Sequence, residues 1–390
     1  MISSDCEIRL GQLMQDIDRD QWNALAAGSG PFLQHEFLHA LEQSGSVHPL
    51  TGWQPFHLTV HQQDRIIAAI PLYLKQHSYG EYVFDWSWAD AYRRYGQNYY
   101  PKLLTAIPFT PSQGSRLLCE NPADRESLTE LISQRVQDHA SKSAISSWHI
   151  LFPDRQDSAA LSQTNLIRRE GCQYHWRNRG YGSFDDFLAA CSSRKRKNLR
   201  KERQDVREQG IEFERIEAGR ITQEIWDIFY RFYQSTYEIR GQQGYLKQAF
   251  FENVALTMPE NLFLVMARKN GDYVAGALFF RDQNALYGRY WGCAADYNNL
   301  HFETCYYQGI DYCIENRLAL FDAGAQGEHK LRRGFEPVQT LSFHWINDPA
   351  FRGAIRDFCD EESVYMTEYR QQAEQHLPYR QSGVVDNKLA

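Results

Sequence analysis

The 390-residue chain lacks several features that would restrict its class. No uninterrupted apolar run approaches the roughly 20 residues of a membrane-spanning helix. The N-terminus, MISSDCEIRL, has no basic segment followed by an apolar one, as a secretory signal would. We therefore expect a cytoplasmic protein without a membrane span.

Signs of bound metal and of covalent catalysis are also missing from the sequence. The eight cysteines include no C-x-x-C pair and no Cys/His ligand spacing, so we predict reduced thiols and neither a metal site nor a disulfide framework. The G-x-S-x-G pattern and the Ser-His-Asp order of hydrolases are absent. Direct attack by an acceptor on an activated donor is the simplest chemistry that remains.

The composition indicates a globular protein of two or three domains, with 43% apolar and 23% charged residues. The net charge of −7 disfavours nonspecific binding to nucleic acid, but one tract is strongly basic. This tract is suited to the phosphates of an RNA strand or a coenzyme. Its alternative role is a solvated helix that connects two halves. The tract comprises Arg194, Lys195, Arg196, Lys197, Arg200 and Lys201.

Two stretches of the chain share the same order of elements. The run that begins at Asp64, RIIAAIPLYLK, is echoed by LFLVMARKNGDYVAGALFF at 262–280, with Asp64 aligned on Asp272, 208 residues later. The pair Tyr99-Tyr100 aligns about one residue out of step with Tyr306-Tyr307. The repeat predicts two strands, a third strand and a helix that begins near each double tyrosine.

The second half alternates helical and extended patterns. This order is typical of a mixed α/β sheet. We expect strands at 211–217, 262–269, 273–281, 285–293, 318–323 and 339–346, and helices at 221–239, 246–257 and 301–316. In the first half we expect a helix at 32–43 and a strand at 56–60.

A dense polar loop follows the short apolar run at 318–321. Glu328 and His329 are candidates for accepting the proton of an attacking amine, and Lys330 and Arg333 for holding a phosphate or a carboxylate. Glu303 is a further catalytic candidate because its helix is expected to face the same cleft. The alternative is an ion-paired loop that orders the end of the strand.

Several segments of the sequence closely resemble segments of the FemAB-like proteins of the GNAT acyltransferase superfamily, a group often described as peptidoglycan biosynthesis/recognition proteins. The segments are HFETCYYQ, GAQGEHK and RRGFEP in the second half, PFTPSQG at 108–114, SRKRKNLRKER at 193–203, and HSYGEYVFDWSWADAYRRYG with YYPKLL within 77–104. The resemblance spans residues 30–380 and implies two tandem GNAT-like domains. We place these at 1–180 and 211–380, joined by a basic helical connector at 181–210 and followed by a flexible tail at 381–390.

The resemblance also bears on the donor. Members of the superfamily cradle a pyrophosphate with an Arg/Gln-x-x-Gly-x-Gly/Ala turn, which Arg289, Gly292 and Ala294 match in letters. Six residues separate this turn from the next predicted helix, which weakens the case for coenzyme A. FemAB-type relatives generally use aminoacyl-tRNA, to which the basic tract is suited.

Candidate substrate-binding residues lie in two groups. Trp86, Asp90 and Arg93 belong to a polar and aromatic island that is suited to an acceptor pocket between domains. The second group surrounds the polar loop that follows residues 318–321. For its aromatic members, packing in the core is the alternative role. It comprises Tyr290, Trp291, His301, Tyr306, Gln326 and Phe335.

Three functions remain open from the sequence. The first is transfer of an acyl or aminoacyl group from acyl-CoA or aminoacyl-tRNA, as a co-substrate, to an amine of a peptide, peptidoglycan precursor or small metabolite. The second is acetyl-CoA-dependent N-acetylation. The third is recognition of peptidoglycan or a peptide without catalysis. The transfer function requires no tightly bound cofactor.

Overall fold

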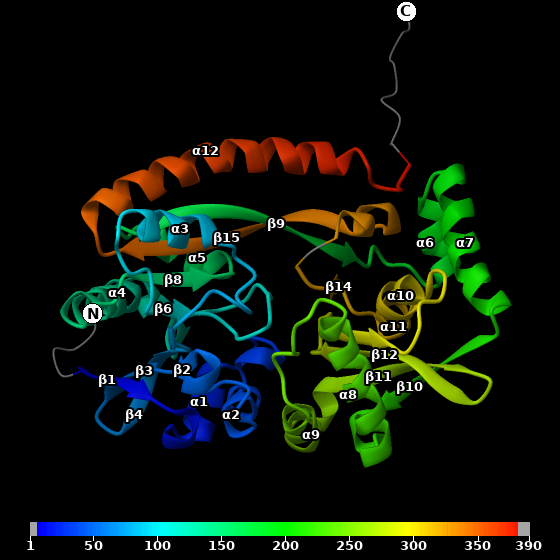
Figure 1. The fold of residues 1–390 in the computed structure, drawn as a ribbon, viewed down its shortest axis with the longest axis horizontal. Helices are drawn as coiled ribbons and strands as arrows, with labels where there is room; N and C mark the ends of the chain where they lie inside the picture. The colour runs from blue at the N-terminus through cyan, green and yellow to red at the C-terminus, as the bar shows by residue number, and fades with distance from the viewer. Residues whose placement is uncertain (1–5, 326, 381–390) are drawn as a thin grey trace, which may run out of the picture.

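The structure is a computed structural model that describes residues 6–325 and 327–380. Two α/β halves lie side by side, and two long strands join them beneath helix α12 (Pro349–Glu374) (Figure 1). The predicted α/β class with a mixed sheet is confirmed. None of the described helices has the length and apolar composition needed to span a membrane.

One sheet of eleven strands runs through both halves. In spatial order its strands are β10 (Ile211–Glu217), β11 (Leu262–Lys269), β12 (Asp272–Arg281), β13 (Ala285–Cys293), β14 (Leu320–Asp322), β9 (Ile167–Arg177), β15 (Glu336–Ile346), β8 (Ser147–Leu151), β6 (Lys102–Thr105), β5 (Tyr73–Lys75) and β2 (Trp53–Pro55). A second sheet of four strands lies in the N-terminal half. Its order is β1 (Cys6–Gln12), β3 (His57–Gln62), β4 (Arg65–Ile70) and β7 (Leu118–Cys119).

The two halves exchange their last strands. β9 belongs to the N-terminal half but pairs with β14 and β15 of the C-terminal half. β15 in turn pairs with β8 and β9 of the N-terminal half. Each half therefore completes the sheet of the other, and the predicted boundary at residue 180 falls just after a strand that both halves share.

The elements predicted for the second half are present. In that half β13 and β14 run parallel and are connected by a helical segment, because a parallel pair requires a crossover. The segment consists of α10 (Leu300–Phe302), the π-helical turn η7 (Glu303–Tyr307) and α11 (Gln308–Glu315). The other helices here are α6 (Phe184–Ala190), α7 (Ser193–Glu208), α8 (Gln223–Glu238) and α9 (Gln248–Thr257).

In the first half, the helix expected to begin near Tyr99-Tyr100 is absent. Helix α3 (Trp86–Arg94) ends before these residues, and Pro101 leads from them into β6. A proline disfavours helical backbone in the residue before it, which explains the error. The counterpart of the segment 300–315 is instead α4 (Arg125–Lys142), which connects the parallel strands β6 and β8. The expected helix at 32–43 is shorter, as α2 (His35–Gln43).

Aromatic packing adds a second junction between the halves. The ring of Phe37 on α2 lies 5.4 Å from that of Phe250 on α9 and 5.6 Å from that of Phe280 on β12, between ring centroids. All three rings are fully buried. Because buried aromatic rings contribute strongly to core stability, this cluster fixes one half against the other.

Candidate active site

A cavity of about 110 Å³ lies in the C-terminal half between β12, β13 and the helical segment 300–307. β13 pairs with β14 only at its beginning, over Ala285–Tyr287, so these two strands part beyond Tyr287. β12 and β13 remain paired, with a register shift between Leu278 and Phe279. The separation of the strands leaves room for a small group. This β13 cavity is lined in part by Arg289, His301, Cys305, Tyr306 and Ala323.

Buried charges stand at the edge of the β13 cavity. Arg289 Nη2 lies 2.6 Å from Asp322 Oδ2, and both side chains are 2% exposed. Ser112, from the other half, donates to the same carboxylate at 3.2 Å. Burial alone would raise the pKa of Asp322, but Arg289 holds that pKa well below its usual range. The site therefore contains a permanent ion pair to which both halves contribute.

Lys330 is the third charged member of this cluster. Its Nζ donates to the carbonyl oxygens of Ala323 at 2.8 Å and Gly324 at 2.7 Å, directly after β14. Burial lowers the pKa of Lys330 to about 7, with Asp322 opposing and Arg289 adding to the shift. A lysine of this kind changes its charge near neutral pH, so it can act either as a cation or as a base.

His175 joins the cluster from β9, although sequence reasoning missed it. Its Nε2 lies 3.9 Å from Asp322 Oδ1 and has no hydrogen-bond partner within residues 6–325 and 327–380. Burial lowers the pKa of His175, so its ring is neutral near pH 7. The spacing of Gln173 and His175 could have indicated this role, because polar residues two apart in a buried strand lie on the same face.

The sequence pattern of Arg289, Gly292 and Ala294 does not form a phosphate cradle. The Ala294 N–H donates to the Val274 carbonyl at 2.8 Å. A Cβ on Gly292 would lie 1.7 Å from the Phe232 carbonyl oxygen, so this glycine serves the close approach of α8. Because the motif continues the sheet and does not open a helix, its N–H groups are not presented to an anion.

Five of the predicted residues pack together beside the cavity. The Tyr306 hydroxyl and His329 Nε2 are 2.8 Å apart, and Phe335 packs against Tyr306. His301 packs against Trp291 and Tyr306. Burial lowers the pKa of both His301 and His329 to about 4, so neither ring carries a charge at pH 7.

Other predicted residues are engaged in contacts of their own. Glu303 accepts two hydrogen bonds from Arg203 of α7, at 2.8 and 3.1 Å. Glu328 is exposed and accepts a hydrogen bond from Tyr369 of α12 at 2.8 Å. Arg333 pairs with Glu202 at 2.9 Å and covers the Phe302 ring. Tyr290 is buried against Tyr233 and Phe251, and Gln326 lies outside the described residues.

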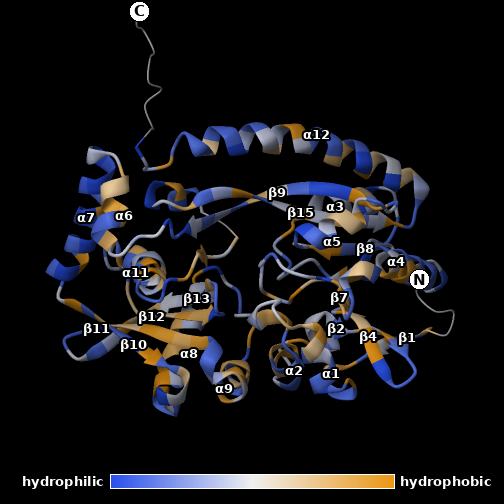
Figure 2. Cartoon of the chain, turned by 180° about the vertical axis from the view of Figure 1, so that it is seen from behind, coloured by the Kyte–Doolittle hydropathy of each residue, from blue (hydrophilic) through white to orange (hydrophobic). Residues whose placement is uncertain are grey.

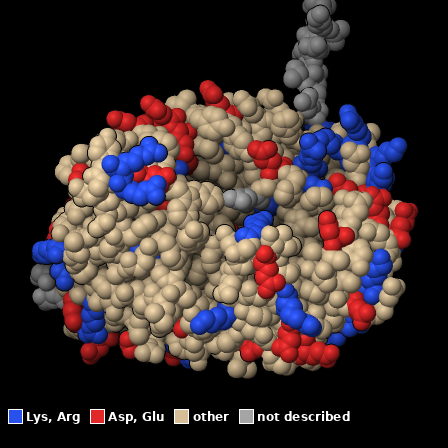
Figure 3. Space-filling view, in the orientation of Figure 1, with Lys and Arg blue, Asp and Glu red and all other residues tan. Residues whose placement is uncertain are grey.

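The basic tract lies on α7, a helix with mainly hydrophilic residues (Figure 2). Lys and Arg side chains gather at the right-hand edge of the molecule, in the region of α6 and α7 (Figure 3). Arg194, Lys197 and Lys201 are exposed, as is Arg200, which pairs with Asp185 at 3.0 Å. Lys195 and Arg196 are half-buried. Part of the tract is thus available to a polyanion.

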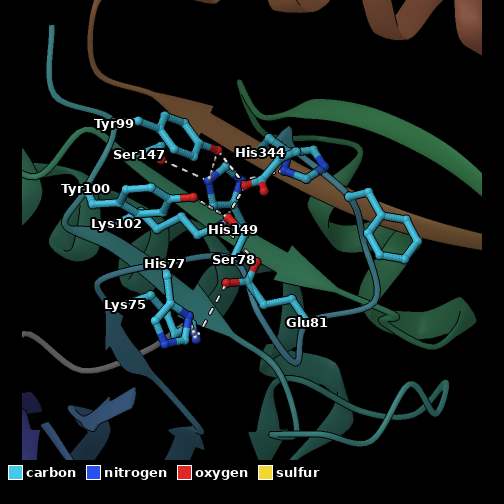
Figure 4. Close-up of polar contacts among 12 residues, drawn as sticks. Lys75, His77, Ser78, Glu81, Tyr99, Tyr100, Lys102, Ser147, His149 and His344 are labelled. Atoms are coloured by element: carbon cyan, nitrogen blue, oxygen red, sulfur yellow. Dashed lines mark hydrogen bonds and ion pairs between the residues drawn. The ribbon is translucent and has the colours of Figure 1, made fainter. Parts of the chain in front are cut away.

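The N-terminal half holds a buried polar cluster, built from the segment 77–104 that resembles the family together with His149 and His344 (Figure 4). Lys102 contacts Glu81, Asp85 and Ser78, and its side chain is fully buried. His149 and His344 share a hydrogen bond of 2.6 Å between their Nδ1 atoms. Trp86, Asp90 and Arg93 are exposed on the neighbouring helix α3 and line neither the β13 cavity nor this cluster.

The strand order, the cavity between separating strands and the buried polar loop define a protein with the tandem GNAT-type acyltransferase fold. The chain belongs to the FemAB-like family, described as peptidoglycan biosynthesis/recognition, whose model matches residues 13–381. No curated protein matches the chain.

Three solved structures share the fold at low sequence identity. The crystal structure of FemX has a TM-score of 0.53 and 14% identity, over 86% of this chain and 98% of that one. The C-terminal domain of a putative lysylphosphatidylglycerol synthetase from Agrobacterium fabrum has a TM-score of 0.51 and 10% identity, over 88% and 95%. L-PGS from Bacillus licheniformis has a TM-score of 0.50 and 10% identity, over 88% and 97%.

Proposed function

We propose that the protein transfers an aminoacyl group from aminoacyl-tRNA to an amine of a peptide or peptidoglycan precursor. The observation that carries the proposal is the β13 cavity with the buried, readily titrating Lys330 at its edge. The family description supports an acceptor related to peptidoglycan. A charged tRNA as donor implies that the protein acts in the cytoplasm.

The chemistry requires little covalent machinery. The acceptor nitrogen attacks the carbonyl carbon, an N–C bond forms, and the C–O bond of the tRNA ester breaks. The acceptor enters as an ammonium ion and gives one proton to a neutral base near the site before it attacks. The second proton, which the nitrogen loses as the amide forms, leaves with the ribose oxygen. Lys330, as an ammonium group, faces the negative charge that develops on the carbonyl oxygen, and a preorganised cation in a buried site is well suited to this role.

The choice of donor rests on two observations. The pattern of Arg289, Gly292 and Ala294 continues the sheet, which disfavours a coenzyme A pyrophosphate at that position. The exposed cations of α7 suit the backbone of an RNA strand, whose phosphates dominate the binding free energy.

Competition binding tests the donor. Purified protein is titrated with aminoacylated tRNA, with uncharged tRNA and acetyl-CoA as competitors. We expect preference for the charged tRNA and affinity that falls as salt rises, with a further loss in the Lys197→Glu/Lys201→Glu variant. Displacement by acetyl-CoA selects an N-acetyltransferase instead. Binding of a peptidoglycan fragment with no transfer from any donor selects a recognition protein.

A further inference from the structure

A second cavity, of about 210 Å³, lies beneath α12 where the two halves meet. We call it the α12 cavity. The loop before α3, the exchanged strands β9 and β15, the polar loop after β14 and α12 itself all contribute to its wall. Representative lining residues are Phe84, Phe152, Gln173, Ala325, Ser342 and Met366.

Gln173 lines the α12 cavity and carries an unused hydrogen-bond acceptor. The side chain is 2% exposed, and its Nε2 donates to the Pro111 carbonyl at 2.8 Å. Because a carbonyl oxygen only accepts, this contact fixes the orientation of the amide. The Oε1 atom has no partner among the described residues. A buried acceptor without a donor costs free energy, which an incoming N–H group would recover.

His175 is a second buried polar group on this face of β9. It lies two residues further along β9, on the same face as Gln173, and its Nε2 also lacks a partner among the described residues. Its other neighbour is Asp322, at 3.9 Å. The loop after β14 separates the two cavities, since Ala323 lines the β13 cavity and Ala325 the α12 cavity.

The charged groups around the α12 cavity already have partners. Arg169 donates to both carboxylate oxygens of Glu362, at 2.6 and 2.9 Å. Glu170 lies 3.0 Å from Arg370. The remaining wall is largely apolar. The unmet requirement in this cavity is therefore for N–H donors carried on an apolar or neutral chain.

We propose that the α12 cavity receives the acceptor, as a primary amine whose N–H group donates to Gln173 Oε1. This inference rests on the proposed function, because it supplies the second substrate of the same site. The cavity is smaller than the roughly 300 Å³ that whole drug-sized ligands fill, so it holds only the amine-bearing end of the acceptor.

A larger groove between the halves is the rival site. It has a volume of about 780 Å³ and is lined by Glu36, Asp154 and Asp282, with Met258 beside them. Its carboxylates are engaged already. Asp282 accepts from the Tyr287 hydroxyl at 2.9 Å, and Asp154 caps a helix through the Asp157 N–H. We therefore favour the α12 cavity, and Met258 reports on the rival.

Methyl NMR of protein with ¹³C-labelled methionine methyl groups tests the inference directly. The probe is n-pentylamine, and n-pentyltrimethylammonium carries the same charge without an N–H group. We expect the amine to shift the Met366 resonance, with the fully buried Met14 and Met266 unmoved. Gln173→Leu should weaken the amine about tenfold or more, since one hydrogen bond to a charged group is lost. A shift at Met258 instead, equal binding of the quaternary ion, or unchanged affinity in Gln173→Leu would overturn the inference.

A pair of α12 variants provides a test that leaves the polar network intact. Met366→Trp fills the cavity, whereas Val364→Trp adds the same ring at a position that is 63% exposed. We expect Met366→Trp to raise the acceptor KM at least tenfold with donor Kd unchanged, and Val364→Trp to leave both constants unchanged. If transfer does not change in Met366→Trp, the α12 cavity is not the acceptor site, but the proposed function still stands. A wild-type protein that transfers to no amine defeats the proposed function, while the NMR result stands on its own.

Discussion

At the scale of single residues, the site depends on three buried charges: Arg289, Asp322 and Lys330. Their net charge is +1 when the lysine is protonated. Burying an unpaired charge is costly, so each of these groups has partners that the fold supplies, namely the carboxylate, the guanidinium and two backbone carbonyls. The excess positive charge is available to a transition state that develops negative charge.

Lys330→Met is expected to lower kcat about 100-fold, which is typical for the loss of one electrostatic stabiliser. The pKa of about 7 means that Lys330 carries its charge below pH 7 and loses it above. The advantage of the wild type over Lys330→Met should therefore shrink as pH rises through 7. The ratio of the two rates at each pH is the measurement, because deprotonation of the acceptor affects both enzymes equally. A ratio that does not change with pH would contradict the role of a cation.

Asp322→Asn is expected to destabilise the protein by about 3–5 kcal/mol, because it leaves the Arg289 guanidinium buried without its carboxylate. The double variant Asp322→Asn/Arg289→Met should recover part of this loss by removing the stranded charge. Denaturant unfolding followed by tryptophan fluorescence measures both. If the two effects simply add, the ion pair is not what stabilises this region.

Some of these residues are readable from the sequence and others are not. Lys330 was predicted because the polar loop follows a buried strand, and Arg289 because it matches the phosphate-binding pattern. His175 does not, because its role arises from the exchanged strand that places it beside Asp322, 147 residues away in the chain. Glu303 was a catalytic candidate, and in the structure it accepts hydrogen bonds from Arg203, a partner 100 residues away that no local pattern indicates.

At the scale of elements, a glycine sets the distance between a helix and a strand. Gly292→Ala would place a methyl group 1.7 Å from the Phe232 carbonyl oxygen on α8, so we expect a loss of several kcal/mol in stability. Gly219→Ala is the matched control, since nothing lies within 4 Å of its added Cβ. Thermal unfolding of both variants checks this. A Gly292→Ala protein with normal stability but weak donor binding would instead restore the phosphate-cradle interpretation.

Most strands of the second half were predictable, because they are long enough to show their apolar pattern. β11 and β12 extend over 8 and 10 residues, whereas β5 and β7 have only 3 and 2. A strand that short carries no periodicity to detect. The repeat was correctly ordered but wrongly assigned, because α4 and not the segment after Tyr100 matches the helix before β14.

At the scale of the whole molecule, the strand exchange makes the halves dependent on one another. We expect one cooperative unfolding transition, with calorimetric and van't Hoff enthalpies that agree, despite a length typical of two domains. We also expect the fragments 1–180 and 181–390 to be unfolded when each is expressed alone and to form the native sheet when expressed together. Two separate transitions, or a folded fragment 1–180, would show that β9 and β15 contribute little to the stability of either half.

The exchange also sets an order of events during synthesis. β8 and β9 leave the ribosome long before β15, since about 160 residues separate the end of β9 from the start of its partner. At about 5–20 residues per second, the nascent chain waits on the order of 10–30 s with these two strand edges unpaired. Unpaired edges attract other strands, so this interval is when a cell making the protein would need a chaperone most.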